Sequence, residues 1–248
     1  MLRFYFIMVP AIIFNLYYIP LMWYIAKHPE KYSEQACYKV GRSLVRMIRR
    51  RGRITTISTG KELLPKDGGY IMYSNHQGKY DMLGIVYTHD KPCAIVIDKE
   101  TTKEILPRLY TKLVKGQRLD KKDPRQQVRA IHQVISEIIE GRRYLIFPEG
   151  GYTDNKNDLL PFHPGSFKIP LKAKCPIIPI AIYDSYKPFS INSIKRVTTQ
   201  VHYLEPILYE QYSTMSTKEI SNLVYERINN KIDEIEEGKP SMKSRKAV

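Results

Sequence analysis

The longest apolar run of the chain lies at its beginning. No residue from Phe4 to Ala26 carries a charge. As a helix rising 1.5 Å per residue, this run would be roughly 35 Å long, comparable with a bilayer core of roughly 30 Å. Pro10, Asn15 and Pro20 interrupt its periodicity. Two membrane arrangements therefore stay open, a spanning helix or two short helices that dip into one leaflet; a buried core helix is the alternative that the length disfavours.

A basic segment follows the apolar run. Between residues 27 and 53, nine Lys or Arg residues stand against Glu30 and Glu34. Read as a helix, the segment has one apolar side and many arginines on the others, which suits anionic headgroups. We therefore expect residues 1–53 to form an N-terminal membrane-associating segment (apolar 4–26, basic amphipathic 27–53). If the apolar run spans, the Lys/Arg bias places the rest of the chain on the cytoplasmic face.

Beyond residue 53 the hydrophobic pattern alternates between strand and helix. The clearest helical period covers residues 127–140 and stops at Gly141, and a last helix is predicted at about 217–236, followed by a charged tail that we expect to be frayed. This order predicts an α/β fold with a mixed, largely parallel sheet covered by helices, in one domain over residues 54–248. The predicted strands are 54–58, 70–74, 93–98, 144–147, 177–183 and 198–204.

Charge and cysteine content narrow the choice of function. The 248 residues carry a formal net charge of +15, which favours a polyanionic partner: nucleic acid, an anionic membrane or a phosphorylated substrate. Three widely spaced cysteines argue against a disulfide framework and a structural zinc site. The sequence has no nucleic-acid-binding signature, so no nucleic-acid partner is expected.

The motif after the second predicted strand pairs a histidine with an aspartate. His76 and Asp81 are five residues apart, about 140° apart on a regular helix, so they can meet only across an irregular turn, which Gly78 would permit. An aspartate that accepts from one imidazole nitrogen leaves the other nitrogen free as a base. The alternative is that both residues merely cap the following helix.

Two further segments are candidates for substrate binding. The first directly follows another predicted strand and consists of Phe147, Pro148, Glu149, Gly150 and Gly151. Its rigid carboxylate and glycine-rich turn could contact a ligand, or the segment could be an ordinary turn at the end of the strand. A basic run between the two motifs includes Arg118 and Lys121, which could hold a phosphate or lie in a solvated loop before a helix N-capped at Asp123.

Together these motifs resemble the PlsC-type glycerolipid acyltransferases, whose best-known members are 1-acylglycerol-3-phosphate (lysophosphatidic acid) acyltransferases. The resemblance rests on N-H-x4-D at Asn75–Asp81, F-P-E-G at 147–150 and P-I-I-P at 176–179, and it covers roughly residues 54–205, with the motif core at about 70–185. It implies that His76 and Asp81 are catalytic. The substrate-binding residues that it implies are Asn75, Arg118, Lys121, Phe147, Pro148, Glu149, Gly150 and Gly151.

The sequence departs from this family at two positions. Tyr152 stands where the family's F-P-E-G-T-R-S motif has its arginine, and Lys121 stands where the middle motif usually has another. An ammonium cannot replace the bidentate guanidinium contact to a phosphate.

The resemblance implies direct acyl transfer. His76 would deprotonate the free hydroxyl of 1-acylglycerol 3-phosphate, which would attack the thioester of acyl-CoA or acyl carrier protein and yield phosphatidic acid. No metal and no cofactor beyond the donor is expected, and the partners are membrane lipids, lysophosphatidic acid and the donor. The alternatives are another acceptor, such as glycerol 3-phosphate or a different lysophospholipid, and a non-enzymatic, membrane-tethered protein that binds lipid or nucleic acid.

Overall fold

Seven strands form the centre of the molecule. The computed structural model describes the backbone of residues 2–238 and the side chains of Tyr5 and residues 16–238. Its strands are β1 (Ile54–Thr59), β2 (Tyr70–Ser74), β3 (Ala94–Asp98), β4 (Gln117–Leu119), β5 (Arg143–Ile146), β6 (Ile177–Tyr183) and β7 (Val197–Tyr203). They form one sheet in the order β1-β7-β6-β2-β5-β3-β4, in which only the β6–β7 pair is antiparallel. The prediction of a mixed, largely parallel sheet is confirmed.

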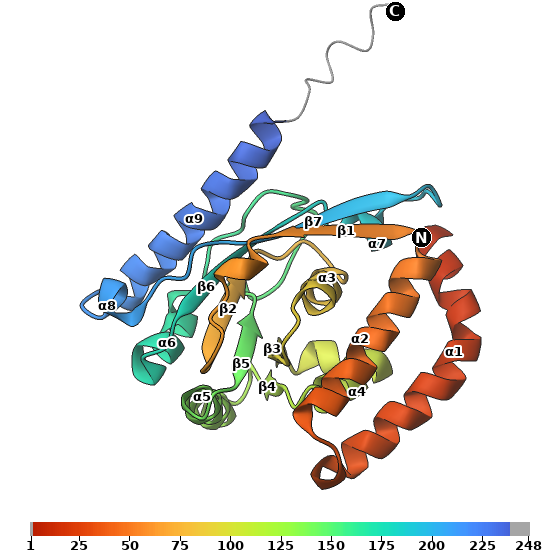
Figure 1. Ribbon diagram of the computed structural model, residues 1–248, viewed down its shortest axis with the longest axis horizontal. Coiled ribbons are helices and arrows are strands. Elements are labelled where there is room, and N and C mark those ends of the chain that lie inside the picture. Colours follow the sequence, from red (N-terminus) through yellow and green to blue (C-terminus); the bar gives the residue numbers. More distant parts are fainter. Residues whose placement is uncertain (1, 239–248) are drawn as a thin grey trace, which may run out of the picture.

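Helices cover both faces of this sheet (Figure 1). One face packs against α1 (Leu2–Lys27), α2 (Glu34–Arg51), α3 (Asp81–Thr88) and α4 (Ile105–Leu113). The other face packs against α5 (Pro124–Ile139), α6 (Lys168–Ala173) and α9 (Thr217–Glu237). The short helices are α7 (Lys187–Ser190), α8 (Tyr209–Tyr212) and four 3-10 turns at Pro29–Lys31, Lys61–Leu63, Glu100–Lys103 and Pro164–Phe167.

Burial explains why the central strands were recognisable in the sequence. Every residue of β2 and β6 is buried, as expected for strands covered on both faces, and such strands read as continuous apolar runs. The six predicted strands agree with the structure to within a residue at each end. The strand that was not predicted, β4, has only three residues and lies at the edge of the sheet beside β3. It is largely polar, so its sequence has no apolar pattern that would identify it as a strand.

The N-terminal apolar run forms a single helix. α1 is continuous from Leu2 to Lys27, so the arrangement with two short dipping helices is wrong. A proline removes only its own N–H from the backbone ladder, and a long helix can tolerate that where its neighbours hold it. Within residues 2–238 as described, we find no helix with the length and apolar character needed to cross a bilayer.

The basic segment forms α2, which lies antiparallel to α1 in Figure 1. Its apolar side packs on the core, with Leu44 and Val45 buried, and its arginines remain on the outside. At the other end of the chain, α9 begins at Thr217 as predicted, with Ser216 and Glu219 forming a capping box. The charged tail predicted to fray lies outside the described residues.

Candidate active site

The turn after β2 brings His76 and Asp81 into direct contact. One oxygen of Asp81, Oδ2, accepts from the backbone N–H groups of Gln77 at 2.5 Å and Gly78 at 2.8 Å. The same oxygen accepts from the His76 Nδ1–H at 2.6 Å. The interpretation of this aspartate as a helix cap is wrong, because α3 is N-capped at Tyr80 without a side-chain bond and the carboxylate accepts from N–H groups that precede the helix. The bonds that shape the turn also hold the imidazole. Gly78 does not adopt a left-handed conformation, so the turn does not depend on glycine there.

Two aromatic rings fix the orientation of the His76 imidazole. The Phe147 ring stacks on it, with centroids 4.3 Å apart and planes at 19°, and the Tyr152 ring meets it edge-on at 4.6 Å. The His76 side chain keeps 19% of its surface exposed, whereas Asp81 is fully buried. When Nδ1–H donates to the carboxylate, Nε2 is the ring nitrogen that can accept a proton.

Glu149 is hydrogen-bonded to the backbone of His76. Its Oε1 accepts from the His76 N–H at 3.0 Å, and its Oε2 is buried without a hydrogen-bond partner among the described residues. Burial raises the pKa of Glu149 to about 8, and the charge of Asp81 adds to the rise, although backbone N–H groups of His76 and Leu160 act against it. Near neutral pH this carboxyl is therefore held largely in its protonated form.

The rest of the F-P-E-G turn is shaped by backbone constraints. Gly150 has a φ of 70°, and a Cβ there would lie 2.9 Å from the His163 ring, so the position requires glycine. The Pro148 carbonyl accepts from the His163 N–H at 2.8 Å. Gly151 is exposed, and a Cβ there would meet no atom within 4 Å.

Buried amides connect the catalytic turn to β6. Asn75, predicted to bind substrate, is buried and uses its side-chain amide to pair with the backbone N–H and carbonyl of Ile182. Gln77 was missed in the sequence. Its amide nitrogen donates to the Ile182 carbonyl at 3.1 Å, and its oxygen accepts from the Ser185 N–H at 2.8 Å. The polar pair that flanks His76 in the sequence was the available signal for this anchoring role.

A loop residue after the F-P-E-G turn also supports the histidine. Asn155 donates from its amide nitrogen to the His76 carbonyl at 3.2 Å and to the Asp158 carbonyl at 2.6 Å. Nothing in the sequence pattern distinguished Asn155 from other polar loop residues.

The two basic residues predicted to hold a phosphate have different environments. Lys121 Nζ donates to the Gly150 carbonyl at 3.1 Å and lies 2.9 Å from Asp98 Oδ2, with its side chain 63% exposed. Although burial acts to raise the pKa of Asp98, the Lys121 ammonium and the Glu100 N–H hold it below its usual range. Arg118 is exposed on β4. The structure thus brings Lys121, but not Arg118, to the F-P-E-G turn.

The assembled groups suit proton transfer next to an anionic ligand. They comprise a carboxylate-bound imidazole with a free nitrogen, a buried carboxyl beneath it and an exposed ammonium at the neighbouring turn. In the described part of the chain, no three His, Cys, Asp or Glu side chains are grouped as metal ligands.

Comparisons with known proteins agree with this geometry. The chain is 29% identical over 153 residues to 1-acyl-sn-glycerol-3-phosphate acyltransferase alpha of Homo sapiens, covering 60% of this chain and 53% of that protein. It is 27% identical over 187 residues to the 1-acyl-sn-glycerol-3-phosphate acyltransferase of Borreliella burgdorferi, covering 73% of each. The matched region spans about half the length of the first curated relatives.

A solved structure has the same fold. The crystal structure of the 1-acyl-sn-glycerophosphate (LPA) acyltransferase PlsC from Thermotoga maritima superposes with a TM-score of 0.74 at 22% identity, covering 97% of this chain and 95% of that one. Residues 56–183, which include every residue of the His76 site, match the profile of the Acyltransferase family. The chain therefore belongs to the Acyltransferase family.

Proposed function

We propose that this protein transfers an acyl chain from acyl-CoA or acyl carrier protein to the free hydroxyl of 1-acylglycerol 3-phosphate, giving phosphatidic acid. The observation that carries the proposal is the His76–Asp81 contact at 2.6 Å, which leaves Nε2 free beside the F-P-E-G turn. The names of the relatives at 27–29% identity support the choice of acceptor.

The reaction follows from the position of the base. His76 Nε2 takes the proton of the acceptor hydroxyl as its oxygen attacks the thioester carbonyl, and Asp81 stabilises the imidazolium that forms. The C–S bond then breaks, and the proton passes from Nε2 to the departing thiolate. Asn75, Gln77 and Asn155 hold the backbone around His76, and the Lys121 ammonium attracts the phosphate of the acceptor.

We place this activity at a membrane surface, with the catalytic domain on the cytoplasmic face. The support is the outer side of α1, where Tyr5, Leu16, Tyr17, Trp23 and Tyr24 are all more than 40% exposed. Large apolar and aromatic side chains on one helix face favour the interface between headgroups and acyl chains.

The direct test is a matrix of acceptors and donors. Purified protein is incubated with lysophosphatidic acid, glycerol 3-phosphate and other lysophospholipids, each with acyl-CoA and with acyl carrier protein thioester, and the products are identified by mass spectrometry. We expect phosphatidic acid from lysophosphatidic acid. Preferred acylation of another acceptor would replace the proposed substrate, and lipid binding without any acyl transfer would favour a non-enzymatic role.

A further inference from the structure

Four arginines from two distant segments line one hollow where β1 and β7 begin. Two of them belong to the last turn of α2, one precedes β1 and one precedes β7. The residues that line the hollow are Arg49, Arg50, Arg53, Ile54, Thr55 and Arg196, and none of them belongs to the His76 site.

The backbone accounts for this convergence. After α2, the chain turns at Gly52, and the Arg53 N–H donates to the Arg50 carbonyl at 3.3 Å. The Arg53 carbonyl in turn accepts from the Val197 N–H at 3.1 Å. This bond joins the start of β7 to the start of β1 and sets Arg196 beside Arg53.

Within the part of the chain that the structure describes, no carboxylate forms an ion pair with these guanidinium groups. Residues 35–59 contain seven Lys or Arg and no Asp or Glu, and residues 185–204 contain three Lys or Arg and no acidic residue. Arg42 and Arg142 form ion pairs with carboxylates, and neither of them lines the hollow. The hollow therefore has an uncompensated positive charge.

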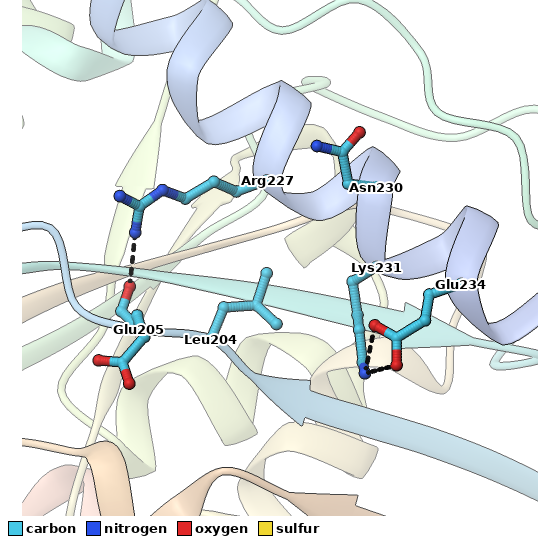
Figure 2. Close-up of a pocket in the computed structure, with 6 residues that line it drawn as sticks. All are labelled: Leu204, Glu205, Arg227, Asn230, Lys231 and Glu234. Carbon is cyan, nitrogen blue, oxygen red and sulfur yellow. Dashed lines mark hydrogen bonds and ion pairs between the residues drawn. The ribbon is translucent and has the colours of Figure 1, made fainter.

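In a second hollow of the molecule, the positively charged side chains have partners. This hollow lies between α9 and the end of β7, and Figure 2 shows both of its cations bonded, Arg227 to a backbone carbonyl and Lys231 to a carboxylate. Arg227 donates to the Glu205 carbonyl at 3.1 Å, and Lys231 lies 2.8 Å from Glu234. These cations already have partners within the molecule, so the hollow does not favour an anionic ligand.

Arg49 supplies a preorganised element at the arginine-lined hollow. Its guanidinium lies 3.5 Å over the centroid of the Tyr87 ring, which limits its rotation. Its Nε is buried without a hydrogen-bond partner among the described residues. A fixed guanidinium loses less conformational entropy when it binds an anion.

Stabilisation of a helix end explains only part of the cluster. Cations in a last turn interact with the partial negative charge there, about half an elementary charge, and Arg49 and Arg50 could serve this purpose. Arg53 and Arg196 lie outside the helix. Four full positive charges exceed what the helix end can balance, so the hollow as a whole favours an anion.

We infer that this hollow binds a phosphate group, carried by an acidic phospholipid headgroup or by a soluble phosphate compound. Arginine forks match phosphate oxygens bidentately. The lipid source is favoured because the first turns of α1 lie beside the end of α2 (Figure 1), and Tyr5 of this helix is 56% exposed. The inference goes beyond the proposed acyl transfer and does not depend on it, because binding can be measured without reaction.

The test compares two full-length variants that each lose two positive charges. R50Q/R196Q alters exposed arginines of the hollow, and the control R129Q/K218Q alters exposed cations on α5 and α9. Binding is measured by co-sedimentation with phosphatidylcholine vesicles with and without phosphatidic acid, and by calorimetry with pyrophosphate. At about a fivefold loss for each basic residue at an anionic surface, R50Q/R196Q should bind the acidic vesicles roughly 10- to 30-fold more weakly.

The two probes distinguish the sources of the phosphate. Loss of vesicle binding in R50Q/R196Q alone assigns the hollow to a lipid headgroup, and loss of pyrophosphate binding alone assigns it to a soluble compound. R50K/R196K should show an intermediate loss, because an ammonium lacks the guanidinium fork. Equal losses in the test and control variants, full retention by R50Q/R196Q, or full retention by R50K/R196K would overturn a built phosphate site.

Discussion

A single carboxylate oxygen organises the residues of the catalytic turn. Asp81 Oδ2 accepts three hydrogen bonds, two from backbone N–H groups and one from His76 Nδ1, and it lies in a fully buried position. The backbone bonds fix the carboxylate before any substrate arrives, so the imidazole is oriented at no further entropic cost. Catalysis should therefore depend on His76 far more than on any other histidine.

We expect His76→Ala to lower acyl transfer roughly 10²- to 10⁴-fold, because the general base is lost. The fold should persist, since the His76 side chain contributes little to the core. The measurement is product formation from lysophosphatidic acid, with circular dichroism as a check on folding. His132→Ala, an exposed histidine on α5, is the matched control and should keep wild-type turnover. Near-normal activity of the His76 variant would contradict the catalytic assignment.

The buried carboxyl of Glu149 should make stability depend on pH. Its pKa is raised to about 8 in the folded protein, so the folded state favours the protonated form. Below the unfolded value of about 4.5 both states are protonated and no penalty exists. As pH rises from there to about 8, the unfolded chain loses its proton first, and folding loses up to about 5 kcal/mol at about 1.4 kcal/mol per unit of pKa.

Glu149→Gln removes this titration while keeping an oxygen that accepts from His76. We expect the variant and the wild type to unfold at similar denaturant concentrations near pH 4.5, and the variant to be the more stable at pH 8. Urea unfolding across this range provides the measurement. A stability difference that stays constant with pH would mean that Glu149 is ionised in the folded protein.

Recognition of the acceptor phosphate should depend on Lys121, because it reaches the Gly150 carbonyl. We expect Lys121→Met to raise the acceptor KM roughly 10- to 150-fold, as for loss of a charge-assisted contact, with a smaller effect on the donor KM. Arg118→Met should matter less, since Arg118 is not brought to the turn. The neighbouring Lys122→Met serves as control, and Tyr152→Arg should partly restore the Lys121 variant. An unchanged acceptor KM in the Lys121 variant would place the phosphate elsewhere.

At the scale of residues, the sequence pattern predicted the groups whose positions are determined by the strands of the sheet. His76, Asp81 and Glu149 follow strand ends, and parallel strands bring such ends together at one edge of the sheet. Gln77 and Asn155 escaped prediction because their partners, Ile182 and the His76 carbonyl, are about 80 to 105 residues away in the chain. Because these side chains bond to backbone groups, the residue types of their partners give no indication of the contact.

At the scale of elements, α1 has one face in the core and one exposed face, a division that its composition does not show. Met22 and Ile25 are buried in the core shared with α2, α3 and α4, while Leu16, Trp23 and Tyr24 are exposed. Because both faces are apolar, the hydrophobic pattern could not show which side packs inward. The length of the run disfavours a buried core helix, yet the structure shows that one face of α1 does pack in the core.

The two faces of α1 should respond differently to truncation. Met22→Ala removes a fully buried side chain and should lower the free energy of unfolding by roughly 2–5 kcal/mol. Leu16→Ala, at a position 74% exposed on the same helix, should change it by less than about 0.5 kcal/mol. Thermal or urea unfolding of both variants checks this contrast. Equal stabilities would mean that α1 does not contribute to the core.

For the whole molecule, the arrangement of α1 indicates how the protein meets a bilayer. Helix α1 lies on the outer side of the layer formed by α1, α2, α3 and α4, whereas α8 and α9 lie on the far side of the sheet (Figure 1). Large aromatic and apolar side chains of α1 are exposed. A net charge of +15 favours acidic membranes, and under the proposed membrane association the outer face of α1 would provide the apolar contact. This arrangement predicts that one side of the molecule lies at headgroup depth and the other stays in water.

The single tryptophan of the chain, Trp23, makes this orientation measurable. Its ring is half exposed on α1, with the Lys27 ammonium 4.0 Å from its centroid. Phosphatidic acid vesicles that contain brominated lipid should quench its fluorescence and shift the emission to shorter wavelength, because an indole at headgroup depth is close to the acyl chains. The matched variant W23F/L208W moves the only tryptophan to an exposed position before α8, where we expect binding without quenching. Quenching at position 208 but not at position 23 would reverse the orientation, and binding without quenching at either position would exclude the α1 face as the membrane contact.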